Sequence, residues 1–373
     1  MFNKSLVAAG LFAAGISTAS AVPYGFFDAR SVAMGNVSVA TGGVQTAAFS
    51  NPAMLAVNEG DDTMALLLPA VGAQVIDDGG VVDKVDEFQA LENDPSVTAR
   101  MRQLAILNEV IANDSTFSVN ATANAALVYA GDSFSMAGDF RAYGTATGSV
   151  TNYNGSTTNP DADLIAFGYL AREIGFSVAT QFSLAGMDIA VGVRPKTVSL
   201  EAITYQSLLS QANTSDIADQ TSQDLGSFTT MDAGIAINIF DSLTLGLVAS
   251  NLLDESKTAS GTTPVPINFD THMRAGIAYH NGFMTLAADM DLTEIDPVLF
   301  EDKSKMAALG IELNAFDFMQ IRAGYQTNMA SGATEPDLFS VGLGFWLGFH
   351  LDVAVVAAEN SSLGAFVQTG FRF

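Results

Sequence analysis

The carboxyl-terminal stretch of the chain alternates between apolar and polar positions. On one side of the expected strand lie Leu363, Ala365, Val367, Thr369, Phe371 and Phe373, and on the other lie Gly364, Phe366, Gln368, Gly370 and Arg372. A period of two is typical of a β-strand. A terminal strand this aromatic would need covering in a water-soluble sandwich, whereas lipid covers it in a membrane barrel. The pattern therefore predicts an all-β transmembrane barrel with its apolar face outward. The rival class is a soluble barrel that carries a ligand in its lumen.

The same alternation recurs along the chain and predicts about fourteen strands, an even number as in bacterial barrels. We expect them near residues 62–77, 116–130, 133–151, 162–182, 187–204, 227–239, 242–251, 269–280, 283–292, 303–315, 318–329, 336–347, 350–358 and 362–373. Tight joints such as Asn281-Gly282 alternate with longer connections, notably 78–115, 152–161, 205–226, 252–268 and 293–302. Short periplasmic turns and long extracellular loops give this asymmetry, which places both chain ends on the periplasmic side.

Parts of two long connections have helical periodicity. Residues 81–91 and 97–111 carry apolar residues three and four positions apart, and Pro95 separates them. Residues 207–225, rich in Ser, Gln and Asp, are a weaker helical candidate. These segments are expected either to cap the barrel mouth or to form an apolar landing groove for a ligand.

Charged residues fall on the face assigned to the lumen. They are Asp232, Arg274, Asp289, Glu312, Arg322, Asp352 and Arg372. An Arg facing lipid at mid-bilayer would cost about 2–4 kcal/mol, which favours the inward assignment. We expect interior ion pairs that hold the wall and the segment inside it together. The alternative, which is compatible with this, is that these residues line a pathway.

The amino terminus and the composition restrict the class of protein. Residues 1–21 have the form of a cleaved secretory signal, and no later apolar run approaches the roughly 20 residues of a membrane-spanning helix. The absence of cysteine excludes disulfides and thiolate chemistry. A formal charge of −25 repels nucleic acid phosphates. We therefore expect an exported protein of a Gram-negative outer membrane, in contact with lipid and lipopolysaccharide, that binds no nucleic acid.

Residues suited to catalysis or metal binding form no recognisable set. His272 and His280 lie eight positions apart on one expected strand, too far to share a metal, and His350 is on another. Asp289, Asp291 and Glu294 lack the spacing of a calcium loop, so we expect a solvated acidic rim there. No Gly-x-Ser-x-Gly motif is present. We expect no enzyme activity, no cofactor and no metal.

Two groups of motifs resemble a known superfamily. An Ala-Arg-x-x-Ala-Met-Gly element at 29–35, followed by Asn51-Pro52-Ala53, resembles the amino-terminal hatch of FadL-type outer-membrane transport barrels. Residues 173–177, 192–196, 245–252, 289–294 and 322–325 are similar to the barrel family of that superfamily labelled conjugal transfer protein TraF, which is distinct from the thioredoxin-like protein of the same name.

The resemblance implies a domain plan and a role. Residues 22–60 would form the hatch and 61–373 the barrel, and Asn51, Pro52 and Ala53 would lie in a plug or merely pack it. Pro69 and Pro195 are candidate strand breaks beside a lateral opening.

The implied role is passive, cofactor-free uptake of a small hydrophobic molecule. The alternative is a non-transporting envelope barrel, such as a conjugation accessory or a surface or structural protein. The last aromatic residues, Phe371 and Phe373, are a candidate signal for the barrel-assembly machinery.

Overall fold

The computed structural model describes residues 28–57, 63–77, 79–113, 115–131, 133–212, 222–240, 242–261, 264–295, 303–316, 318–333, 335–358 and 362–373. The expected signal peptide, 1–21, lies outside the described residues, as do residues 22–27 and 58–60 of the expected hatch. Within the described residues, no helix combines the length and the hydropathy needed to cross a bilayer.

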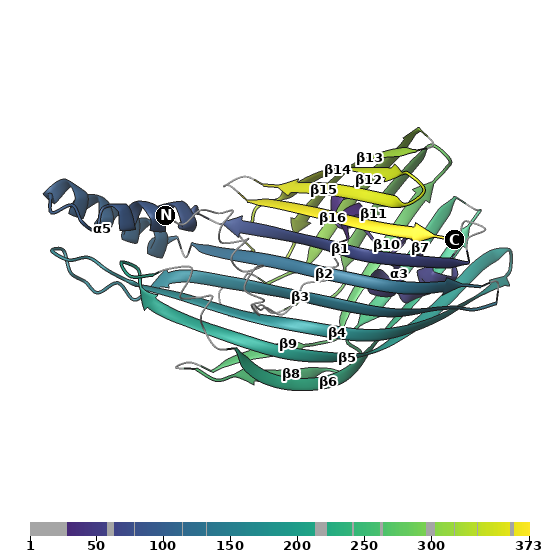
Figure 1. Ribbon diagram of the computed structural model, residues 1–373, viewed down its shortest axis with the longest axis horizontal. Helices are drawn as coiled ribbons and strands as arrows, with labels where there is room; N and C mark the ends of the chain where they lie inside the picture. The colour runs from purple at the N-terminus through teal and green to yellow at the C-terminus, as the bar shows by residue number, and fades with distance from the viewer. Residues whose placement is uncertain are drawn as a thin grey trace.

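Fourteen antiparallel strands close into one barrel (Figure 1), as the alternation predicts. They are β1 (Met64–Asp77), β2 (Thr116–Ala130), β3 (Ser135–Thr151), β4 (Asp163–Leu184), β5 (Met187–Leu208), β6 (Gln223–Ile239), β7 (Leu243–Ser250), β10 (His272–His280), β11 (Met284–Asp291), β12 (Met306–Phe316), β13 (Met319–Asn328), β14 (Leu338–Trp346), β15 (His350–Ala357) and β16 (Leu363–Arg372). Every expected strand is present. Because β1 pairs with β16, the sheet has no free edge.

The apolar side of the alternation faces outward. On β16, Leu363 and Val367 are 59% and 39% exposed, whereas Phe366 and Gln368 are each 4% exposed. The same orientation holds on the long strands, where Ile174 and Phe176 are exposed and Glu173 is buried. An outer surface of this kind suits hydrocarbon rather than water, so the soluble-carrier alternative does not fit the fold.

The strands differ greatly in length. Strands β4 and β5 have 22 residues each, and β7, β11 and β15 have 8 each. At the usual rise these lengths correspond to about 70 Å and about 26 Å. Figure 1 shows the long strands, in teal, extending past the shorter yellow and green strands. The β2–β6 sector therefore rises well beyond the rest of the wall.

The two ends of the barrel differ in their connections. The tight joints, including Ala185-Gly186 between β4 and β5, lie at the end where β16 finishes, which we call the short-turn end. Helices α4 (Val81–Ala90) and α5 (Val97–Ala112) lie at the opposite end, the loop end (Figure 1). Their apolar residues, such as Phe88 and Ile106, pack with Leu164 and Tyr205 of β4 and β5. The apolar sides of both helices therefore pack against the wall at this end.

Two connections differ from their expectation. Strands β8 (Glu255–Ala259) and β9 (Val265–Phe269) form a separate two-stranded sheet between β7 and β10, where a connection without strands was expected. The helical candidate at 207–225 is wrong at both its ends, because β5 continues to Leu208 and β6 begins at Gln223. Its middle, 213–221, lies outside the described residues.

The segment 28–57, called here the amino-terminal segment, lies inside the barrel. It comprises α2 (Ala29–Ala33), α3 (Ala47–Ser50) and the 3-10 helix η1 (Pro52–Ala56). Helix α2 contacts β13–β16, while η1 contacts β3–β6 on the other side of the lumen. Asp28 caps α2 by accepting a hydrogen bond from the Ser31 N–H at 2.9 Å. The segment therefore spans the lumen from wall to wall.

Candidate functional site

The inward side chains of β5 fall into three groups along the strand, which define three layers of the lumen beside it. From the short-turn end, its inward residues are Ala190, Gly192, Arg194, Lys196, Val198, Leu200 and Ala202. Small residues thus come first, then cations, then apolar side chains, and all are buried. We call these levels the seat, the ion-pair layer and the apolar layer. Inward residues of β3, β4 and β6 follow a similar order, with Asp139 and Arg141, Glu173 and Asp232 at the level of the β5 cations.

The Asn51-Pro52-Ala53 element docks against the seat. The Asn51 amide nitrogen donates to the carbonyls of Val39, at 2.9 Å, and of Ile235 on β6, at 3.2 Å. Its amide oxygen accepts from the Ala53 N–H at 3.1 Å and so caps η1. Gly234 lies against the Asn51 side chain, and a Cβ at Gly234 would overlap it. The predicted hatch residues therefore contact the wall where only the smallest residue leaves room.

A second close approach fixes the other side of the segment. The backbone of Met34 and Gly35 lies directly on Gly324 of β13 and Gly310 of β12, which pair with each other. The Gly35 N–H also donates to the Ser340 hydroxyl at 3.0 Å. Main chain therefore meets main chain at this contact, which leaves no space for side chains between them.

The ion-pair layer joins four strands. Its cations are Arg141, Arg194 and Lys196, and its carboxylates are Asp139, Glu173 and Asp232. Arg194 is fully buried and contacts all three carboxylates, with Glu173 and Asp232 at 3.0 Å each. The ring of Phe49 from α3 lies 5.8 Å from the Arg194 guanidinium. Three positive and three negative groups give this buried layer no net charge.

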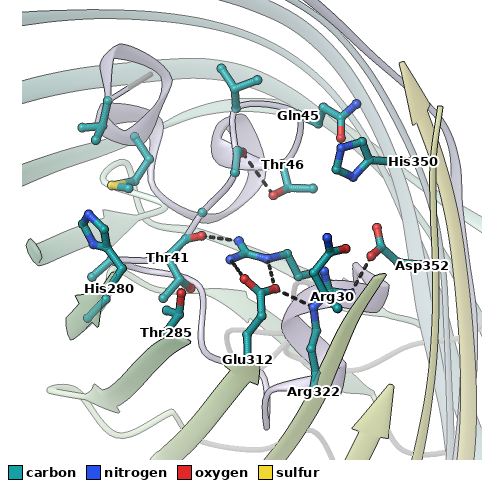
Figure 2. A pocket seen from close by; sticks show the side chains of 18 of the residues that line it. Arg30, Thr41, Gln45, Thr46, His280, Thr285, Glu312, Arg322, His350 and Asp352 are labelled. Atoms are coloured by element: carbon teal, nitrogen blue, oxygen red, sulfur yellow. Dashed lines mark hydrogen bonds and ion pairs between the residues drawn. The ribbon is translucent and has the colours of Figure 1, made fainter. Parts of the chain in front are cut away.

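Arg30 of α2 ties the amino-terminal segment to the opposite wall (Figure 2). Its Nε and Nη2 donate to the two oxygens of Glu312 on β12, at 2.9 and 3.0 Å, and its Nη1 donates to the Thr41 carbonyl at 2.5 Å. Arg322 of β13 bridges Glu312, at 2.6 Å, and Asp352, at 2.5 Å. Burial would lower the pKa of Arg30, but the charge of Glu312 outweighs this and the pKa is raised. The guanidinium therefore stays charged.

A third ionic contact holds the backbone between α2 and α3. Asp289 of β11 accepts hydrogen bonds from the N–H groups of Ser38 and Val39, at 2.7 and 3.0 Å. Arg274 of β10 donates to the Asn36 carbonyl at 3.2 Å and contacts Asp291 at 3.3 Å. Asp289 and Asp291 are 2% and 0% exposed, so the expected solvated acidic rim is wrong there. Glu294 instead pairs with Lys303 outside this cluster, at 3.1 Å.

A cavity of about 230 Å³, lined by both polar and apolar residues, separates part of the segment from the wall. Figure 2 shows Arg30, Gln45, His280 and His350 around it, and Arg372 also lines it. The predicted lumen residues thus occupy three clusters: Asp232 in the ion-pair layer, Arg274 and Asp289 on the segment backbone, and Glu312, Arg322, Asp352 and Arg372 at the cavity.

The apolar layer lies at the loop-end side of the ion pairs. It comprises Tyr143 of β3, Phe167, Tyr169 and Ala171 of β4, Val198, Leu200 and Ala202 of β5, and Phe228 of β6. The β8–β9 hairpin packs onto these side chains with Ala259, Val265, Ile267 and Phe269. Polar side chains were expected throughout the lumen, so this apolar stretch is an unforeseen feature.

The two prolines differ in their effect on the wall. The register of β1 shifts between Leu67 and Ala70 against both neighbours, so Pro69 lies in a bulge. Pro195 pairs with Met231, the β5–β6 register does not shift from Asp188 to Ser199, and the β4–β5 register is the same on both sides of Pro195. The barrel stays closed at both positions.

Several charged residues of these clusters were not predicted as lumen charges from the sequence, namely Arg30, Asp139, Arg141, Arg194 and Lys196. The strand residues among them occupy inward positions of predicted strands, so the period of two was the available signal. Among the described residues, no group of three or more His, Asp or Glu could hold a metal ion.

The chain is a closed fourteen-stranded barrel with residues 28–57 in its lumen, and several solved outer-membrane channels have a similar fold. Among solved structures, the CymD monoaromatic hydrocarbon channel is 12% identical, with 93% of this chain and 97% of that chain covered and a TM-score of 0.55. The toluene transporters TbuX of Ralstonia pickettii and TodX of P. putida are each 14% identical, with 93% and 98% covered and TM-scores of 0.51.

Residues 48–291 match the protein family described as "F plasmid transfer operon, TraF, protein". Because the match covers more than half of the sequence, the chain belongs to this family. No curated protein sequence matches it.

Proposed function

We propose that the chain is an outer-membrane barrel that passively admits small hydrophobic molecules, with residues 28–57 as its plug. The short-turn end would face the periplasm and the loop end the exterior. The exposed apolar band would contact lipid and lipopolysaccharide, and Phe371 and Phe373 would present the signal read by the assembly machinery. Export through residues 1–21 belongs to the same proposal.

The apolar layer is the observation that carries this proposal. A barrel that passes only water and ions has a polar interior. Here Phe167, Tyr169 and Leu200 are buried inside the lumen, on the loop-end side of the plug. A neutral hydrophobic solute would exchange water for these side chains, at about 25 cal/mol for each Å² of apolar surface buried.

The structural relatives suggest the kind of solute. TodX and TbuX are described as toluene transporters, and CymD as a monoaromatic hydrocarbon channel. Since identity to each is 14% or less, they support the fold directly and the substrate class only by analogy. Toluene is therefore the first probe rather than an assigned substrate. Of the two prolines, Pro69 is the better candidate for a lateral opening, because the register shifts at Pro69 and does not shift at Pro195.

The test is uptake of radiolabelled toluene by Gram-negative cells that lack other hydrocarbon channels, since lipopolysaccharide slows the passage of hydrophobic solutes. Cells producing the chain should take up toluene faster than cells with an empty vector. Leu200→Asn, which places an amide in the apolar layer, should lower the rate, and Leu200→Met should not. Heat-modifiable migration in gels establishes that each variant folds. Equal uptake with and without the chain would refute the transport proposal.

A non-transporting envelope barrel, such as a conjugation accessory, is the second candidate. The ion-pair layer favours it, because these buried charges offer no apolar surface to a solute. Under this proposal the uptake experiment gives no signal, while deletion of the chain alters mating frequency or envelope integrity.

A further inference from the structure

The β8–β9 hairpin inserts its apolar side into the lumen. Along β9, Val265, Ile267 and Phe269 are buried, whereas Pro266 and Asn268 are exposed. The ring of Phe269 lies 4.8 Å from that of Phe228 and 6.1 Å from that of Tyr169. The hairpin thus presents side chains of hydrocarbon character to the apolar layer, in the space that a hydrophobic solute would fill.

Among the described residues, few polar contacts hold the hairpin in place. Each strand has five residues, and β8 and β9 pair only with each other, outside the barrel ladder. An isolated two-stranded sheet is marginally stable in water, so its position depends on side-chain contacts. At its base, Asp254 accepts from the N–H and the hydroxyl of Thr271, at 2.7 and 2.9 Å. Near its far end, Ser260 exchanges two hydrogen bonds with Gln223 of β6, at 2.8 and 3.2 Å.

These contacts define an element that is anchored at its base and attached weakly elsewhere. The Ser260–Gln223 bonds are exposed and join neutral groups, so water competes with both. Lys257 lies 5.7 Å from the Phe228 ring, at the edge of the cluster. Opening the hairpin would therefore break few polar bonds and would expose chiefly apolar surface, which a hydrophobic ligand could cover again.

We propose that the apolar layer is the entry site for a neutral hydrophobic molecule, and that the β8–β9 hairpin occupies this site until the ligand displaces it. The ligand class follows from what it replaces: the ring of Phe269 and the branched side chain of Ile267. A molecule of that size, aromatic or branched alkyl and without charge, matches the space. This inference rests on the proposed function and adds to it the place of entry and the segment that gates it.

Because the chain has no cysteine, single thiols can report the position of the hairpin. In the purified full-length barrel, Ile267→Cys is treated with a membrane-impermeant maleimide with and without toluene. Labelling occurs only when the hairpin is open. Toluene at about ten times its dissociation constant for the open form should therefore raise the labelling rate about tenfold. Val265→Cys repeats the test at a position nearer the hairpin tip. Asn268→Cys, on the exposed side, should label equally under both conditions.

A disulfide provides the second test. Oxidised Gln223→Cys/Ser260→Cys would tie the hairpin to β6, and its toluene uptake in cells should fall to the empty-vector rate and return on reduction. The matched control, Ser256→Cys/Asn268→Cys, links two residues that pair across the hairpin and leaves the hairpin free of the wall. That variant should take up toluene at the rate of the unmodified chain, whether oxidised or reduced.

The two tests separate the inference from the function on which it rests. If uptake occurs but toluene leaves the labelling of both Ile267→Cys and Val265→Cys unchanged, or the tied variant still transports, the hairpin is not the gate. If labelling rises while the unmodified chain shows no uptake, the hairpin yields to the ligand and transport is the part that fails.

Discussion

The bond between Arg30 and Glu312 should control how firmly the amino-terminal segment is held. Replacing Arg30 with Met keeps a long apolar side chain but removes both hydrogen bonds to Glu312 and the one to the Thr41 carbonyl. A hydrogen bond to a charged group contributes about 1.5–3 kcal/mol. We count only the two bonds to Glu312, each at the low end of this range, because Arg30 is 25% exposed and Glu312 keeps its partner Arg322. The expected loss is about 3 kcal/mol, or roughly a hundredfold larger released population.

Maleimide labelling of Ser50→Cys measures this release. Ser50 lies in α3, is 2% exposed and differs from cysteine by one atom. In the background Arg30→Met, its labelling should accelerate by about two orders of magnitude. The matched control is Arg172→Met, since Arg172 pairs with Glu201 and both are substantially exposed. Exposed pairs contribute about 0–1 kcal/mol, so this control should change labelling only a few-fold.

A double-mutant cycle identifies the source of the effect. Glu312→Gln alone should also release the segment, and adding Arg30→Met to it should cost much less than Arg30→Met costs alone. The reasoning fails if Arg30→Met and Arg172→Met change the labelling of Ser50→Cys equally. It also fails if the effects of Arg30→Met and Glu312→Gln simply add.

Three further substitutions test other contacts. Gly324→Ala would place a Cβ on the backbone of Gly35 and should release the segment to the Ser50→Cys label, whereas Gly138→Ala, with nothing within 4 Å, should not. Arg194→Met would leave three buried carboxylates with two cations and should destabilise the barrel by about 3–5 kcal/mol, seen as a lower midpoint of heat-modifiable migration. Phe373→Ser should lower the yield of assembled barrel in cells while the detergent-refolded barrel keeps its midpoint, and equal yields would contradict an assembly role for the terminal aromatic residue.

The strands could be predicted because the two faces of every strand contact different surroundings. Lipid on one side and a polar lumen on the other impose a period of two, which is visible without any knowledge of partners. The β8–β9 hairpin obeys the same period, with Val265, Ile267 and Phe269 on one face. It was missed because each strand has only five residues and Pro266 lies within β9, which argues against a central strand.

The inward charges could be predicted, but their partners could not. A strand register places Arg194 inside the lumen, yet its partner Asp139 lies on β3, two strands away. Arg30 and Glu312 are 282 positions apart and meet only because the amino-terminal segment lies inside the closed barrel, where α2 packs against the wall. The acidic-rim prediction failed for the same reason, since Asp289 and Asp291 depend on Arg274 of the neighbouring strand. Such ion pairs depend on the closure of the barrel and on the position of the amino-terminal segment inside it. The local pattern of apolar and polar residues does not reveal them.

The order of the layers determines which barrier a solute would open first. A neutral molecule in the apolar layer faces the ion-pair layer on one side of the lumen and the amino-terminal segment on the other. Separating the groups of the ion-pair layer would leave several fully buried charges without partners. Breaking each buried pair costs about 3–5 kcal/mol. Breaking the Arg30–Glu312 pair alone costs about 3 kcal/mol, because this pair is partly exposed, and the wall contacts of Gly35, Ser38 and Asn51 remain in place. Under the proposed function, the part of the segment around Arg30 should therefore move while the ion-pair layer stays rigid, so Arg30→Met should speed toluene uptake and Arg194→Met should act on stability alone.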